Sequence, residues 1–192
     1  MIEHNGKKYA RVTEVLSQES NLDGIDPAII QNKARIGSNV HAAIHELIQG
    51  ECPILDRDEI LYFKSFKKWA DHIRPVFVES EIRRYNEEKM LTGCIDAVIQ
   101  LHGKDERIIV DYKTSSQVNS SYWSKQAHLY AFLLRGTCSQ ISDTYFFLKL
   151  DKYGELPQLV KFKYDANVHK ECMQLIDKFW LDQNLILKKC QI

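Results

Sequence analysis

Two carboxylates and a lysine stand within the most strand-like part of the sequence, LTGCIDAVIQLHGKDERIIVDYKTSS (91–116). Asp111 and Lys113 are two residues apart, so in a strand their side chains project from the same face. Asp96 lies in the preceding apolar run and can face the same side, whereas Tyr112 points away and offers its backbone carbonyl. Carboxylate and carbonyl oxygens are the ligands that Mg²⁺ or Mn²⁺ prefers. With a lysine beside them to hold a phosphate oxygen or orient the attacking water, the pattern indicates metal-assisted phosphodiester hydrolysis.

Acidic residues upstream extend this candidate site. Glu79 and Glu81 share one parity in the segment VFVESEIRRY (76–85). Either of them completes the site if this segment pairs with the strand that follows it. Nearby arginines and lysines are alternative partners for both acids, so the sequence leaves the choice between Glu79 and Glu81 open.

Polar side chains on predicted helices flank the acids. His41 follows Gly37 by four residues, and Gln126 and Tyr130 have the same spacing, which places each pair on one helical face. His41 and His45 are also four residues apart, as in a metal-binding pair, but no HExxH arrangement accompanies them. A capping or surface role is therefore favoured for His45.

Hydrophobic periodicity predicts the elements that position these residues. A short helix or turn is expected over 12–18 and a loop over 21–28, followed by a helix over 28–50 with Asp26 as its N-cap. In a second helix over 57–73, one face is expected to be buried: Ile60, Phe63, Phe66 and Ala70. The period then becomes extended and predicts three antiparallel strands, at 76–85, 91–101 and 107–115.

The C-terminal half returns to helix and then to strand. A helix is predicted over 121–136, ended by Gly136 as the C′ residue. Two strands (144–150 and 158–164) and an amphipathic helix (167–189) complete the chain. The order of helices, three strands, helix, two strands and helix predicts an α/β or α+β fold with a mixed sheet flanked by helices.

Length and charge restrict the class of protein. The 192 residues, 44% hydrophobic and 27% charged, contain no repeat or linker, which predicts a single domain over 1–192. The 26 basic and 26 acidic residues cancel, which argues against a purely charge-driven nucleic-acid binder. A nuclease remains compatible with this neutrality, because bound divalent cations supply positive charge where the phosphate sits.

Cysteine usage and the N-terminus predict the compartment. The five cysteines are scattered singly without a CxxC pair, which supports neither a zinc site nor a disulfide framework. Their odd number fits a reducing compartment. No apolar leader and no segment of membrane-spanning length is present, so we expect a cytoplasmic protein without a membrane partner.

The motifs occur in an order that resembles the RecB-type exonuclease branch of the PD-(D/E)XK nuclease superfamily. That order is Gly-x-x-x-His on a helix, a Glu-bearing strand, Gly-x-x-Asp, Asp-x-Lys-Thr and Gln-x-x-x-Tyr on a helix. The branch includes phage recombination and mitochondrial genome-maintenance exonucleases, and YARVTEVLS (9–17) with ARIGSNVHAAIHE (34–46) is similar to phage and prophage members. The resemblance implies a restriction-endonuclease-like core, with the His motif in 1–75, the catalytic sheet and QxxxY helix in 76–150, and a closing strand and helix in 151–192.

The resemblance also implies a role for each candidate residue. The implied metal ligands are His41, Asp96, Asp111 and the carbonyl of Tyr112. The implied catalytic residues are Lys113, Asp111, Asp96 and, as the best match for the upstream acid, Glu81. Gln126 and Tyr130 are expected to support the site and contact DNA. The basic residues expected along a DNA path are Lys33, Arg35, Arg83, Arg84 and Lys125.

The activity implied is a Mg²⁺- or Mn²⁺-dependent DNA exonuclease that degrades linear DNA from ends in recombination, repair or phage DNA processing. The four-cysteine group that holds an iron–sulfur cluster in some relatives is missing, so no cluster is expected. No fused helicase is expected from these 192 residues. A recombinase, a single-strand-binding protein or a helicase is therefore the expected kind of protein partner.

Three other functions are alternatives to this interpretation. The first is a structure-specific endonuclease. An exonuclease is expected if the helices predicted within 26–50 and 56–73 arch over the site and admit only DNA ends. A DNA-binding protein with a decayed site is disfavoured because every expected residue type is present. A metal hydrolase of another class, built on His41 and His45, would ignore the acids and the lysine of the strands.

Overall fold

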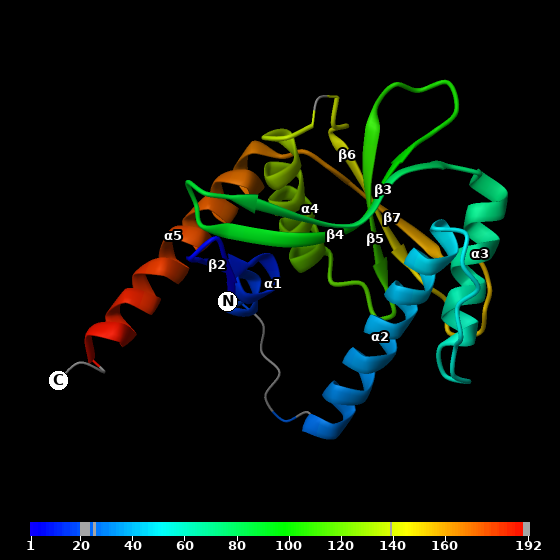
Figure 1. Ribbon diagram of the computed structural model, residues 1–192, viewed down its shortest axis with the longest axis horizontal. Coiled ribbons are helices and arrows are strands. Elements are labelled where there is room, and N and C mark those ends of the chain that lie inside the picture. The colour runs from blue at the N-terminus through cyan, green and yellow to red at the C-terminus, as the bar shows by residue number, and fades with distance from the viewer. Residues whose placement is uncertain (20–23, 25, 139, 190–192) are drawn as a thin grey trace.

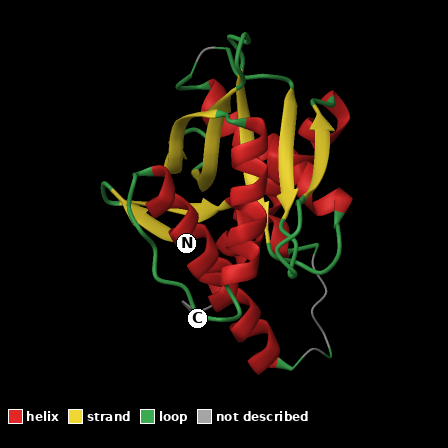
Figure 2. Ribbon diagram, turned by 90° about the vertical axis from the view of Figure 1, so that its right-hand side faces the viewer, coloured by secondary structure: helices red, strands yellow, loops and turns green. Residues whose placement is uncertain are grey.

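A mixed seven-stranded sheet forms the centre of the computed structural model, which describes residues 1–19, 24, 26–138 and 140–189 (Figures 1 and 2). The strands are β1 (Ile2–His4), β2 (Lys7–Arg11), β3 (Val76–Asn86), β4 (Leu91–Gln100), β5 (Arg107–Lys113), β6 (Thr144–Lys149) and β7 (Gln158–Lys163). The helices are α1 (Val12–Ser17), α2 (Pro27–Ile48), α3 (Ile60–Ile73), α4 (Ser120–Arg135) and α5 (Ala166–Lys189). Residues 21–23 and 25 of the loop predicted over 21–28 lie outside the described residues.

The sheet follows the predicted fold class. Its order is β1-β2-β4-β5-β6-β7, and β3 pairs with β4 off this path. The strands β3, β4 and β5 form the predicted antiparallel meander, β6 runs parallel to β5 after the crossover through α4, and β7 is antiparallel to β6. The prediction of a mixed sheet flanked by helices is thus confirmed.

The N-terminal hairpin of β1 and β2 is missing from the sequence-based prediction. Asn5 and Gly6, with φ of 50° and 72°, form its turn. The two strands span only three and five residues, with Tyr9 and Ala10 as the buried pair, so the alternation is too short to predict a strand. After the turn β2 pairs in parallel with the start of β4.

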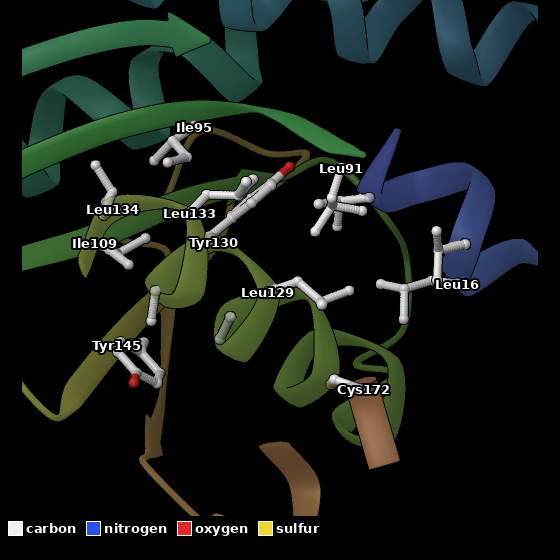
Figure 3. Packing of buried hydrophobic residues seen from close by; sticks show 14 of the residues in the cluster. Leu16, Leu91, Ile95, Ile109, Leu129, Tyr130, Leu133, Leu134, Tyr145 and Cys172 are labelled. Atoms are coloured by element: carbon white, nitrogen blue, oxygen red, sulfur yellow. The ribbon is translucent and has the colours of Figure 1, made fainter. Parts of the chain in front are cut away.

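Helices cover both faces of the sheet and enclose two apolar clusters. In Figure 1, α4 and α5 lie on one side of the sheet and α2 and α3 on the other. Figure 3 shows the α4 side, where Leu129, Tyr130, Leu133 and Leu134 of the helix lie near β4 and β5. The cluster beneath α2 and α3 contains Val40, Ile44, Phe66, Val110 and Tyr112. Burial of these apolar surfaces at about 25 cal/mol per Å² is the main force that holds the helices on the sheet.

Three predictions about helix ends and faces can be compared with the structure. Asp26 caps α2 as predicted, because its carboxylate accepts the Ala28 N–H at 2.8 Å. Gly136 ends α4 as predicted, but it is the C-cap residue, with φ −73°, and not the C′ residue. The expected burial of Ile60 is wrong: Ile60 is 38% exposed, whereas the preceding Glu59 is buried and accepts a hydrogen bond from Arg35. No helix in the described residues is both long and apolar enough to span a membrane.

The sheet forks along one edge of β4. Both β2 and β5 pair with this edge, but β2 pairs with residues 91–92 and β5 with residues 97–100. Of the intervening residues, 93–95 pair with β3, and within the described chain none of 93–96 pairs with β2 or β5. Across from the fork, β3 has a register shift between Phe77 and Glu79, and Glu81 has a φ of 51°. The middle of β4, around Asp96, therefore has no strand neighbour on this edge in the described chain.

Gly93 allows α4 to pack into this fork. A Cβ atom at this position would lie 2.9 Å from Tyr130 Cε1, 3.0 Å from Leu133 Cδ1 and 3.1 Å from Val12 Cγ2. These distances are shorter than normal carbon–carbon contacts, so an added methyl group would displace the Tyr130 ring.

We predict that Gly93→Ala lowers the free energy of unfolding by about 1–3 kcal/mol, as overpacking does. Urea denaturation of the wild type and the variant measures the change. Gly136→Ala is the matched control, because Gly136 has φ −73° and open space around it. Equal unfolding free energies for the two variants would show that the fork tolerates a side chain.

Candidate active site

The alternation of β5 places two charged side chains together. Val110 and Tyr112 join the apolar cluster beneath α2 and α3. Asp111 and Lys113 therefore project from the other face, as predicted, and Asp111 Oδ2 lies 2.6 Å from Lys113 Nζ. Asp111 is only 1% exposed, so a charge on its carboxylate depends on this partner.

Gln126 of α4 connects these two side chains. Its Oε1 accepts a hydrogen bond from Lys113 Nζ at 2.9 Å, and its Nε2 donates to Asp111 Oδ1 at 3.3 Å. The same Nε2 lies 2.9 Å from the Tyr130 hydroxyl, one helical turn further along α4. Gln126 thus contacts both the lysine and the acid, and Tyr130 contacts Gln126. Their role in supporting a site and contacting DNA stays a prediction.

Asp96 lies at the fork, where its side chain replaces a missing strand partner. Its Oδ2 accepts the backbone N–H of Tyr112 at 2.7 Å, and its Oδ1 lies 3.2 Å from His41 Nδ1. His41 Nε2 in turn lies 2.9 Å from the carbonyl oxygen of Tyr112. The Tyr112 peptide therefore joins the strand of Asp111 and Lys113 to His41 on α2.

The structure brings Glu81 to the site and turns Glu79 away. Glu81 Oε1 lies 3.9 Å from His41 Nδ1, and Glu81 Oε2 accepts a hydrogen bond from the Cys94 thiol at 3.2 Å. Glu79 forms an ion pair with Arg84 instead. The contact with Cys94 is missing from the sequence-based prediction, although Cys94 shares the parity of Asp96 on β4.

Burial and the charges of neighbouring groups shift the pKa values of this cluster. Burial would lower the pKa of His41, but the Asp96 carboxylate raises it to about 9. Burial raises the pKa of Asp111 to about 7, against the opposing effect of Lys113. Burial and then the charge of Asp96 also raise the pKa of Glu81. Three acids share a small, poorly solvated volume, and additional positive charge would relieve their repulsion.

The donor atoms suit a hard divalent cation. His41, Glu81 and Asp96 each offer one ligand atom, and these atoms all lie within 4.8 Å of one another. Both ring nitrogens of His41 lie near oxygen acceptors, Asp96 Oδ1 at 3.2 Å and the Tyr112 carbonyl at 2.9 Å. An imidazole binds a cation through an unprotonated ring nitrogen. Carboxylate and carbonyl oxygens are ligands that hard divalent cations prefer, whereas imidazole also suits transition metals. Asp111 lies outside this compact group, held by Lys113 and Gln126.

Comparison with known proteins agrees with this geometry. The sequence matches the profile of the PD-(D/E)XK nuclease superfamily over residues 56–183, which is more than half of the chain. The chain belongs to this superfamily. The matched range includes the strands with Glu81, Asp96 and Lys113 and the helix with Gln126, whereas α2 with His41 precedes it.

Solved structures share the fold at low sequence identity. An alkaline exonuclease from Laribacter hongkongensis, LHK-Exo, has a TM-score of 0.54 and 10% identity, with 95% of this chain and 91% of that chain covered. The complex of LHK-Exo with dAMP gives the same TM-score at 9% identity and the same coverage. A proposed exonuclease from Eubacterium rectale has a TM-score of 0.56 and 11% identity, with 96% and 83% covered. No curated protein sequence matches.

Most of the basic residues expected along a DNA path are already paired in this PD-(D/E)XK chain. Arg35 Nη1 lies 2.8 Å from Glu59, Lys125 Nζ lies 2.8 Å from Glu19, and Arg84 pairs with Glu79. Arg83 lines a separate hollow with Arg11 beside β4. Lys33 differs from these four, because it lines the same hollow as His41 and Lys113. We therefore retain Lys33 as a candidate for DNA contact.

His45 lies near the site but bonds to a neutral group. Its Nδ1 lies 2.8 Å from Ser80 Oγ, one turn of α2 beyond His41. We predict that His45→Ala retains cleavage activity within about threefold, because one hydrogen bond contributes only about 1 kcal/mol. Initial rates of DNA cleavage at saturating Mn²⁺ measure this, and a loss approaching that of an Asp96 variant would make His45 a member of the site.

Proposed function

We propose that the chain is a divalent-metal-dependent deoxyribonuclease that degrades DNA from its ends. The observation that carries the proposal is the junction at Tyr112. Its peptide N–H binds Asp96 and its carbonyl faces His41, while Asp111 and Lys113 flank it on the same strand. This junction holds a cluster of metal-ligand types directly beside an acid–lysine pair, as phosphodiester hydrolysis requires.

Each side chain has a proposed task in this reaction. His41, Glu81 and Asp96 would hold the cation through ligand atoms that lie within 4.8 Å of one another, and the Tyr112 carbonyl lies beside His41. Asp111, which contacts Lys113 and Gln126, would be a further ligand. A bound Mg²⁺ or Mn²⁺ would supply a lowered pKa for water and positive charge at the phosphoryl oxygens. Lys113 Nζ is oriented by two partners, Asp111 and Gln126, and has a third N–H for the substrate. That N–H would donate to a phosphoryl oxygen as negative charge develops on it.

Action from DNA ends is supported by the similar structures and by the position of α2. Both similar proteins are described as exonucleases, and LHK-Exo has been seen with dAMP, a deoxynucleotide. In this chain α2 lies against the site and contributes His41 to it, so the helix limits the approach of DNA from that side. Recombination, repair or phage DNA processing is the setting that we propose for this activity.

A comparison of end-labelled linear DNA with covalently closed circular DNA tests the proposed end dependence. With Mg²⁺ or Mn²⁺ we expect loss of the linear DNA while the closed circle stays intact. Nicking or linearisation of the circle would instead assign a structure-specific endonuclease. Binding of either DNA without cleavage would assign a binding protein on a nuclease fold.

A further inference from the structure

A groove leads away from the candidate active site on one side of His41. It consists of two hollows that share Ser115 and Ser116, directly after the strand that carries Lys113. The hollow next to His41 also contains Lys33 and Lys113. The hollow beyond it contains Lys149, Lys152 and Tyr62. We call the two hollows together the basic groove.

Positive charge in the basic groove is largely uncompensated. Within the described part of the chain, neither Lys33 nor Lys149 forms an ion pair with a carboxylate. Lys152 Nζ lies 4.8 Å from the centre of the Tyr153 ring, which leaves its charge available. The groove contains one acid, Asp151, and its Oδ1 accepts the backbone N–H groups of the following turn at 2.8 and 3.1 Å.

The hollow on the other side of His41 has the opposite charge. Glu46, Glu81 and Asp96 line it together with His45. The next hollow in that direction contains Glu46 again, with Glu59. Glu59 pairs with Arg35, and Glu81 and Asp96 are candidate cation ligands, so Glu46 is the acid that leaves this side negative. A DNA backbone carries one negative charge per phosphate, so such a carboxylate repels it, whereas unpaired lysines attract it.

We propose that the DNA backbone extends from the active site along the basic groove only, so that the substrate strand is held on one side of the scissile phosphate. Lys149 and Lys152 would contact phosphates, and hydroxyl groups of Ser115 and Ser116 would accompany them. Tyr62 is the aromatic side chain of the outer hollow and offers a surface for an unpaired base. The inference rests on the proposed nuclease function and adds the path of its substrate.

The test is the affinity of single-stranded DNA for a variant with Lys149→Gln and Lys152→Gln. Fluorescence anisotropy of a labelled oligonucleotide in EDTA measures Kd without cleavage, at a series of KCl concentrations. We expect about tenfold weaker binding at low salt, and a slope of log Kd against log salt that is smaller by roughly 1.4, or about 0.7 for each of two phosphates. Thermal melting monitors whether the variant is folded.

The matched control removes two positive charges elsewhere. Lys170→Gln with Lys178→Gln changes exposed lysines of α5, which packs against α4 on the opposite side of the sheet, and should leave Kd and the slope unchanged. Glu46→Gln tests the acidic side and should not weaken binding. Wild-type affinity and slope in the Lys149 and Lys152 variant, or weaker binding by Glu46→Gln, would overturn the one-sided path.

A separate substrate keeps this inference distinct from the nuclease proposal. The p-nitrophenyl ester of thymidine 5′-monophosphate is too short to extend along the basic groove. Its hydrolysis by the wild type with Mn²⁺ reports on the active site alone. If the wild type hydrolyses neither this ester nor DNA, the proposed function fails. If the wild type hydrolyses both substrates and the Lys149 and Lys152 variant binds single-stranded DNA normally, only the proposed path of the DNA along the basic groove is wrong.

Discussion

Replacement of Lys113 by methionine is expected to lower the single-turnover rate of DNA cleavage by about 10²–10³-fold, the loss seen when one charge-stabilising donor is removed from an active site. Lys113 Nζ lies 2.6 Å from Asp111 and 2.9 Å from Gln126, so its direction is fixed before substrate binds. Methionine keeps an unbranched apolar stem, which can still pack near Phe147, but it has no N–H to donate.

Folding and DNA binding should survive this change. Burial raises the pKa of Asp111 to about 7 even with Lys113 opposing it. Without the lysine, the carboxyl can take up a proton and avoid an unpaired buried charge. Thermal melting and DNA anisotropy should therefore be close to those of the wild type, which would separate a chemical defect from a structural one.

Lys161→Met is the matched control for Lys113→Met. The two lysines lie over neighbouring phenylalanine rings, with Lys113 Nζ 5.3 Å from the Phe147 centroid and Lys161 Nζ 5.4 Å from the Phe146 centroid. Lys161 lies on β7, and none of its described contacts reaches the site. Normal cleavage by Lys113→Met, or an equal loss in both variants, would show that Lys113 has no special part in the chemistry.

The second large effect is expected for Asp96→Asn, which should weaken Mn²⁺ binding by roughly 100-fold or more and abolish metal-dependent cleavage. Asparagine has the same shape, and its carbonyl can still accept the Tyr112 N–H. The negative charge beside His41 is lost, however, and a cation then has one anionic ligand fewer. The variant thus separates metal affinity from the geometry of the fork.

Titration calorimetry with Mn²⁺ measures this affinity, and Asp105→Asn provides a control with the same chemical change in the exposed turn between β4 and β5. The control should bind Mn²⁺ as the wild type does. Unchanged Mn²⁺ affinity and cleavage in Asp96→Asn would place the metal elsewhere in the molecule.

The parts of the site that the sequence predicts best lie on regular elements. In β5 strict alternation is enough to place Asp111 with Lys113 and to turn Tyr112 to the other face. In α4 the spacing of four residues is enough to bring Gln126 to the Tyr130 hydroxyl.

The choice between Glu79 and Glu81 needs the structure because β3 is irregular. Two residues of one parity would normally share a face, but the register shift before Glu79 and the φ of 51° at Glu81 interrupt the alternation. As a result the neighbours Ser80 and Glu81 both contact histidines of α2. A pattern with period two cannot predict such a change of face.

Long-range ion pairs also lie beyond the reach of the sequence. Arg35 and Lys125 look suitable for DNA contact because each is basic and close in sequence to a site motif. Their partners, Glu59 and Glu19, are 24 and 106 residues away along the chain. Only the packed fold shows that these charges are already compensated, whereas Lys33 and Lys149 remain available.

The most direct test of the central proposal is the cleavage of end-labelled linear DNA by the wild type with Mg²⁺, with Mn²⁺ and with EDTA, beside the Asp96→Asn and Lys113→Met variants. We expect release of label with either metal, none with EDTA, and almost none with either variant. Cleavage in EDTA, or cleavage at the wild-type rate by both variants, would contradict a metal-dependent nuclease site at the fork of the sheet.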